Sequence, residues 1–142
     1  AFFHGRFGQS IVNMARMNNE SMFGSNNQSK AVLRRWKNEG DNTDIPRALY
    51  NEGRNYLGSD RFVEKASFVR LKSMTLSYGF PRKICNRFNV NSLSVFVTGY
   101  NLFTWTNYTG QDPEVSVKDN LAIDTATTPV AKRFSFGLNM SF

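Results

Sequence analysis

The 142-residue sequence predicts an all-β chain made of four antiparallel strands of a membrane-spanning β-barrel. Three observations predict this class. Apolar and polar residues alternate with a period of two in the strand candidates, which places apolar side chains on one face of each strand. Long and short connections alternate along the chain. No apolar run is long enough for a transmembrane helix.

The clearest strand candidate is the segment 131–142. From Arg133 onward, polar or small residues alternate strictly with apolar ones, and the alternation continues to Phe142. The apolar positions are Phe134, Phe136, Leu138, Met140 and Phe142. Because chain ends usually fray, such a regular strand with an aromatic last residue indicates a special role for this segment.

A second strand is predicted at 91–107. Leu93, Val95 and Val97 share one face of it. Beyond them the pattern becomes mixed, and a β-bulge near Gly99 explains the change.

A third strand is predicted at 67–80. Val69 and Leu71 have one parity, whereas the later apolar residues have the other, so the apolar face changes near Lys72. We therefore expect a second bulge at Lys72 and Ser73. Pro81 ends the strand because it cannot donate a ladder hydrogen bond.

The opening segment 1–13 is predicted as the first strand. A long loop at 14–66 follows it, and a short helix is expected in this loop at Ser29–Asn38, with Ser29 as its N-cap. A short link covers 81–91, and a second long loop covers 108–131. In an antiparallel meander both long loops then lie at one edge of the sheet, as in outer-membrane barrels.

Four strands cannot close such a barrel, because the smallest have about eight. An open sheet in lipid would leave two unpaired edges, which the hydrocarbon does not tolerate. We therefore expect this chain to be the C-terminal part of a larger protein.

Composition and motifs exclude several other classes. The net charge is +7, but the basic residues are dispersed and no nucleic-acid-binding module accompanies them. One cysteine excludes a disulfide framework. No catalytic constellation, phosphate loop or paired metal ligands are present, so we expect neither an enzyme nor a cofactor.

Several segments resemble signatures of the SusC/RagA family. They are SFVRLKSMTLSYGFP at 67–81, VFVTGYNLFTWTNYTG at 95–110 followed by Asp112-Pro113-Glu114, NTDIPR at 42–47, SDRFVE at 59–64, and RFSFGLNMSF at 133–142. In order and spacing the match covers about residues 30–142.

The resemblance implies a TonB-dependent outer-membrane transporter of Bacteroidetes-type bacteria. The family fold is a 22-stranded barrel with an N-terminal plug. It imports oligosaccharides or peptides together with a SusD-like lipoprotein, and it is energised by the TonB–ExbB–ExbD complex through an N-terminal region outside this chain. This chain would then supply the last four strands and the last two extracellular loops.

Five residues of the first long loop are candidate contacts for the substrate or the lipoprotein lid, because aromatic faces stack on sugar rings and arginine binds carboxylates. They are Arg34, Trp36, Tyr50, Arg54 and Tyr56. The alternative is packing within the loop, with Trp36 on the apolar side of the short helix.

Two further groups of residues are candidates in the strands. Arg70 and Lys72 alternate with Val69 and Leu71, so we expect them to face the lumen, where charges tune selectivity or pair with the plug or neighbouring strands. The resemblance also implies that the last strand is a signal for the barrel-assembly machinery, carried by Phe136, Met140 and Phe142. Simple lipid contact is the alternative for these three.

Two other functions stay open at this point. A soluble β-sandwich carbohydrate-binding module also has short alternating strands and exposed aromatic residues. It would bury the apolar face of the last strand in a core. A structural outer-membrane barrel without a transport role is the second alternative.

Overall fold

The computed structural model describes residues 1–114, 117–118 and 121–142. The chain forms two compact units. The first, called the sheet unit, contains residues 1–7, 68–106 and 129–142, and the second, called the loop unit, contains residues 8–67 and 107–128.

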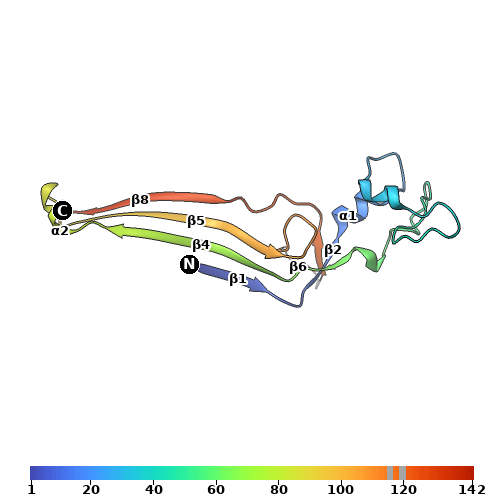
Figure 1. Cartoon of the computed structure of the whole chain (residues 1–142), viewed down its shortest axis with the longest axis horizontal. Coiled ribbons are helices and arrows are strands. Elements are labelled where there is room, and N and C mark those ends of the chain that lie inside the picture. Colours follow the sequence, from blue (N-terminus) through green and yellow to red (C-terminus); the bar gives the residue numbers. More distant parts are fainter. Residues whose placement is uncertain (115–116, 119–120) are drawn as a thin grey trace. The chain divides into compact units, whose positions relative to one another are not determined.

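The sheet unit is one antiparallel sheet of four strands (Figure 1). Its strands are β1 (Phe2–Arg6), β4 (Phe68–Gly79), β5 (Ser92–Thr106) and β8 (Arg133–Ser141). Their order in the sheet is β1-β4-β5-β8. The segments predicted as strands at 67–80, 91–107 and 131–142 therefore hold the three longest strands.

One irregularity interrupts the pairing of β4 with β5. Ser73 pairs with Tyr100, whereas Leu71 pairs with Phe103, so Lys72 faces both Asn101 and Leu102. Asn101 has a positive φ of 52°, a conformation that asparagine tolerates better than most residues. The irregularity expected near Gly99 is thus a bulge whose extra residue in β5 lies beyond Gly99. The irregularity expected at Lys72 is also present, because Phe2 of β1 pairs with Ser73 and Phe3 pairs with Leu71, which leaves Lys72 as an extra residue of β4.

A short helix, α2 (Arg82–Arg87), connects β4 to β5. Pro81 is its N-cap residue, which agrees with the expectation that Pro81 ends the preceding strand. Cys85 and Val90 are buried on the inner side of this connection. The Cys85 Sγ lies 3.5 Å from the carbonyl oxygen of Phe80, so the helix is held against the end of the sheet.

The prediction of one continuous strand at 1–13 is wrong. β1 ends at Arg6, and Ser10–Asn13 form β2 in a different sheet. Gly8 lies between them with φ of +74°, which residues with a Cβ rarely adopt and which redirects the chain. Helix α1 (Met14–Asn19) follows at once, and the Asn13 side chain caps it by accepting a hydrogen bond from the Arg16 backbone N–H.

The loop unit contains a second sheet that the sequence analysis did not predict. Its strands are short: β3 (Val63–Lys65), β2, β7 (Leu121–Asp124) and β6 (Val117–Lys118), in that order. β2 pairs antiparallel with β3 and parallel with β7. The two long connections are therefore joined to each other by hydrogen bonds between strands.

The remaining elements of the loop unit are 3₁₀ helices, η1 (Lys30–Arg34) and η2 (Asp60–Phe62). The predicted helix at Ser29–Asn38 is shorter than expected and is η1. Ser29 is its N-cap, as predicted, because its hydroxyl accepts a hydrogen bond from the Ala31 backbone N–H. Among the described residues, no helix is both long and apolar enough to cross a bilayer.

Candidate functional site

One face of the sheet formed by β4, β5 and β8 is almost entirely apolar, and it is called the apolar face. Side chains that pair directly across strands share a face. Leu76 pairs with Val97, and Val97 pairs with Phe136, so these three lie in one row. Phe136 is 80% exposed and Leu76 is 62% exposed. The other members are Met74, Tyr78, Leu93, Val95, Phe134, Leu138 and Met140.

The opposite face of the same strands is called the polar face. Thr75 pairs with Thr98, and Thr98 pairs with Ser135. The two threonine hydroxyl oxygens lie 2.8 Å apart and share a hydrogen bond. Successive residues of a strand point to opposite sides, so this row lies between the apolar rows but on the other surface.

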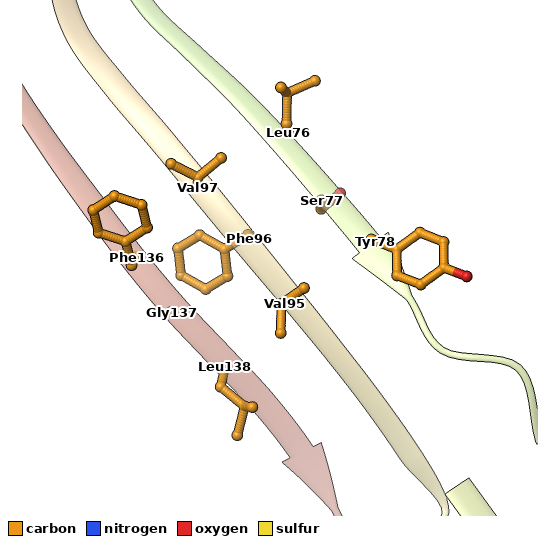
Figure 2. A pocket seen from close by; sticks show the side chains of 9 residues that line it. All are labelled: Leu76, Ser77, Tyr78, Val95, Phe96, Val97, Phe136, Gly137 and Leu138. Atoms are coloured by element: carbon orange, nitrogen blue, oxygen red, sulfur yellow. The ribbon is translucent and has the colours of Figure 1, made fainter. Parts of the chain in front are cut away.

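A shallow hollow lies over the three strands, near the end of β4 and the beginning of β5 (Figure 2). It is lined by Leu76, Ser77, Tyr78, Val95, Phe96, Val97, Phe136, Gly137 and Leu138. None of these side chains carries a charge, and only two carry a hydroxyl group. Such a surface provides dispersion contacts for apolar groups but few polar groups to orient a ligand.

Charge is divided very unevenly between the two units. All 11 Asp and Glu residues belong to the loop unit. The sheet unit has no acidic side chain, and its basic ones are Arg6, Arg70, Lys72, Arg82, Lys83, Arg87, Lys132 and Arg133. The positive charge of the chain therefore comes from the sheet unit.

The basic side chains of the sheet unit lie at the two ends of the sheet, and each end is called a basic level. One level is the end of the sheet from which the long connections leave, where Arg133 pairs with Tyr100 next to Lys72. The other level is the turn at α2. The strands between them carry no charged residue. From Phe134 in β8 to Phe142 the chain carries no charge, and this uncharged stretch has about the length of one tilted membrane-spanning strand.

Aromatic rings accompany the basic level at the long-connection end. Phe103 and Trp105 have ring centroids 6.0 Å apart, and Phe3 lies 6.5 Å from Trp105. The Lys132 Nζ lies 5.4 Å from the centroid of Phe103, and the Arg133 guanidinium lies 4.7 Å from that of Tyr100. Aromatic and basic residues together are typical of a membrane–water interface.

Arg70 and Lys72 have different surroundings. Arg70 is only 4% exposed, and its Nε donates a hydrogen bond of 2.9 Å to the Thr104 hydroxyl. It pairs with His4 on one side and Thr104 on the other, so these three share a face. Lys72 lies at the bulge and is half-buried.

The three candidate signal residues of the last strand are exposed. Phe136 and Met140 lie on the apolar face, where Met140 pairs with Leu93. Phe142 follows the end of β8 and is 82% exposed. The side chains therefore form one accessible apolar stripe.

Arg34 and Trp36 lie together in the loop unit. The Arg34 guanidinium forms an exposed ion pair of 3.5 Å with Asp44. The Trp36 backbone N–H donates a hydrogen bond to the Ile45 carbonyl oxygen, and the Trp36 side chain lines a shallow hollow with the segment Thr43–Arg47. The ring is about one third exposed, so it packs on the loop and also presents a surface to solvent.

Tyr50, Arg54 and Tyr56 have other neighbours. Tyr56 packs against Phe23, with ring centroids 5.8 Å apart. Arg54 forms an ion pair with Glu52, and Tyr50 is 74% exposed. The five loop candidates thus fall into two groups with different contacts.

A polar cluster surrounds Glu64, and no pattern in the sequence predicted it. Its Oε1 accepts hydrogen bonds from Arg16 at 3.0 Å and from Asn13 at 3.2 Å. Its Oε2 accepts bonds from the Thr109 hydroxyl at 2.6 Å and from the Thr109 backbone N–H at 3.2 Å. Burial opposes ionisation of Glu64, but these bonds outweigh it and hold the pKa of the carboxyl below its usual value.

Buried polar groups continue on both sides of this cluster. Glu20 accepts a hydrogen bond from Arg16 at 2.9 Å and lies 3.9 Å from the Arg61 guanidinium, which stacks on the Phe62 ring. Tyr108 donates a 2.7 Å hydrogen bond to Asp124. Burial together with this carboxylate raises the pKa of Tyr108. No group of three His, Cys, Asp or Glu residues in the described part of the chain is arranged to hold a metal ion.

No sequence periodicity indicates this cluster, because its members come from three separate segments. The signal available was weak: Glu64 and Thr109 both fall within the quoted family-like segments. Their joint role is to tie the two long connections together.

Comparisons with known proteins give a consistent result. No family model matches the chain. It is 30% identical to TonB-dependent receptor P3 of Formosa agariphila, over 99% of the chain and 14% of that receptor. It is 33% identical to TonB-dependent receptor SusC of Bacteroides thetaiotaomicron, over 67% of the chain and 9% of that receptor.

Solved structures agree with the sequence relatives. The structure of the RagAB peptide transporter superposes with a TM-score of 0.80 and 26% identity, covering 99% of the chain and 15% of that chain. The chain belongs to the SusC/RagA family of TonB-dependent transporters. It resembles the open-open and closed-closed states of the RagAB peptide importer about equally, with TM-scores of 0.77 and 0.76. The chain spans about one seventh of the length of P3, so the similarity covers only one segment of that receptor.

Proposed function

We propose that this chain forms the last four strands and the last two extracellular loops of the 22-stranded barrel of a SusC/RagA-type transporter in the bacterial outer membrane. In this proposal β4, β5 and β8 contact lipid with their apolar face. The loop unit then lies on the extracellular side. The chain closes the barrel and shapes part of its outer vestibule.

The apolar face of β4, β5 and β8 carries this proposal. In the row of Leu76, Val97 and Phe136, the side chains of Leu76 and Phe136 are largely exposed. Such exposure of apolar side chains is unfavourable in water but suits contact with lipid. In a soluble β-sandwich this face would be covered by a second sheet. Here Phe136 is 80% exposed instead.

The two edge strands also support a larger barrel. β1 and β8 each have only one neighbour in the sheet. Edge strands within a bilayer need partners because unpaired N–H and C=O groups are costly in hydrocarbon. Further strands of the same protein, pairing with β1 and β8, would satisfy them.

Transport of oligosaccharides or peptides with a SusD-like lipoprotein is the activity that we propose for the whole protein, driven by TonB–ExbB–ExbD. The support is the similarity to receptors named as TonB-dependent and to the RagAB peptide transporter. Arg34, Trp36, Tyr50, Arg54 and Tyr56 would contact the substrate or the lipoprotein. Among these, Trp36 beside the exposed Arg34–Asp44 pair offers an aromatic face together with both charges.

We also propose roles for the candidate residues in the strands. Arg70 and Lys72 would contribute to the inner surface of the barrel near its outer mouth. Phe136, Met140 and Phe142 would be read by the barrel-assembly machinery as an exposed apolar stripe before they contact lipid. Both roles need the complete barrel.

Uptake by cells that express the full-length receptor tests the transport proposal. Cells should accumulate fluorescent oligopeptides or oligosaccharides only when TonB and the partner lipoprotein are present. The variant W36A should reduce uptake of the accepted class, whereas K30A, which changes another exposed side chain of the same loop, should not. Uptake that is independent of TonB would contradict the proposal.

A further inference from the structure

The turn at the α2 end of the sheet has an unusual combination of side chains. Arg82, Lys83 and Arg87 are all exposed, and so are the apolar side chains of Ile84, at 39%, and Phe88, at 64%. The sheet unit has no acidic residue to neutralise the three cations. The turn therefore presents three cations and two apolar groups to its surroundings.

The turn is fixed in orientation. Cys85 is 2% exposed and Val90 is 5% exposed, so this side of the turn faces the sheet. The Phe80 N–H donates to the Leu93 carbonyl oxygen, and the Asn91 N–H donates to the Ser141 carbonyl oxygen, at 2.9 Å and 2.7 Å. These bonds tie both ends of the turn to the sheet. α2 lies at one end of the sheet (Figure 1), so the three cations are held at that end of the strands.

The two basic levels of the sheet unit differ in their partners. At the long-connection end, Lys132 and Arg133 lie over aromatic rings, and Arg70 bonds to Thr104. The ion pairs and cation–π contacts found within residues 1–114, 117–118 and 121–142 do not involve Arg82, Lys83 or Arg87. Anionic groups outside the chain would complement the α2 turn best.

We propose that the α2 turn binds the headgroups of anionic phospholipids, with Arg82, Lys83 and Arg87 on the phosphates and with Ile84 and Phe88 inserted among the acyl chains. This inference rests on the proposed function, which places the turn opposite the extracellular loops. The lipid is then that of the inner leaflet of the outer membrane. Basic residues beside the bilayer attract anionic lipid, and apolar neighbours add buried area.

Lipid titration of the detergent-purified full-length receptor tests this proposal. Dioleoyl-phosphatidylglycerol, dioleoyl-phosphatidylcholine and lipopolysaccharide are the probes, and native mass spectrometry counts the bound molecules. The variant R82Q/K83Q/R87Q should lose phosphatidylglycerol affinity by about fivefold for each charge removed. The control K30Q/R47Q/K65Q removes the same charge from exposed positions of the loop unit and should bind phosphatidylglycerol as the wild type does.

Several results would overturn the proposal. They are unchanged phosphatidylglycerol binding in the turn variant, equal losses in both variants, or a loss confined to lipopolysaccharide or phosphatidylcholine. If the turn variant does not fold, the wild type decides, because its phosphatidylglycerol binding must weaken as salt rises from about 0.05 M to about 0.5 M. Salt-independent binding contradicts the proposal.

Failure of the proposed function would be recognised separately. A folded barrel migrates faster in an unheated gel than in a heated one, and this shift is measured first on the wild type. A wild-type protein without the shift contradicts the barrel itself. A wild-type protein with the shift but without charge-dependent lipid binding contradicts only the role of the turn.

Discussion

The ring of Phe96 in β5 covers Gly137 in β8. The two residues pair directly across the strands, and a Cβ atom added to Gly137 would lie 2.2 Å from the Phe96 Cζ (Figure 2). Glycine at this position therefore allows an aromatic ring to lie flat on the neighbouring strand. Phe96 and Gly137 lie on the polar face, in one row with Ser77.

Replacement of Gly137 should consequently disturb the packing of β5 against β8. We expect G137A to destabilise the full-length receptor by about 1–3 kcal/mol, because the new methyl group forces the Phe96 ring to move. Urea unfolding in lipid vesicles measures this change. Gly79 is the matched control, since nothing lies within 4 Å of a Cβ at that position. Equal stability of G137A and G79A would show that the ring does not constrain residue 137.

A charge on the apolar face should cost far more than a charge on the polar face. For F136R we expect a loss of about 2–4 kcal/mol, because the guanidinium is placed in hydrocarbon. S135R adds the same group one residue earlier, on the opposite face, and should cost much less. The comparison is made by the same unfolding measurement. Similar losses for the two variants would contradict the assignment of the faces.

The hydrogen bonds of Glu64, which hold the two long connections together, should weaken in acid. The pKa of Glu64 is lowered in the folded protein, so its hydrogen bonds stabilise the fold fully above the unfolded carboxyl pKa and are lost as the pH falls through the lowered value. Hydrogen exchange of the peptide containing Thr109, corrected for intrinsic rates, should accelerate from about pH 7 to about pH 3.

The variant E64Q should remove most of this pH dependence, because the amide does not titrate. E52Q is the control, since Glu52 forms only an exposed pair with Arg54. If hydrogen exchange accelerated equally in acid in the wild type and in E64Q, groups other than Glu64 would hold the two long connections together.

The sheet unit could be predicted from sequence because its strands alternate for long stretches. β8 keeps one parity from Arg133 to Ser141, and period-two alternation is a local property. The bulge at Lys72 was visible as a change of parity, and the pairing of β1 with β4 has a register shift there. The bulge expected near Gly99 lies slightly further along β5, opposite Lys72.

The loop unit could not be predicted in the same way. Its strands have two to four residues, too few for a periodic signal. β2 looked like the continuation of β1, and only the positive φ of Gly8 separates them. The contacts of Glu64 depend on segments 45 and 51 residues away in sequence, which no local pattern reveals. For the same reason, the sequence did not indicate that Trp36 and Tyr56 have different neighbours.

Spin labels along β8 test the central claim most directly, which is that this face contacts lipid. Single cysteines are introduced in the full-length receptor, in a C85S background, as F134C, F136C and L138C on the apolar face and as S135C and N139C on the polar face. In lipid vesicles, we expect oxygen accessibility to be high at the first three positions and low at the other two. Uniform accessibility, or labels at 134, 136 and 138 that are shielded from oxygen as in a protein core, would contradict the account.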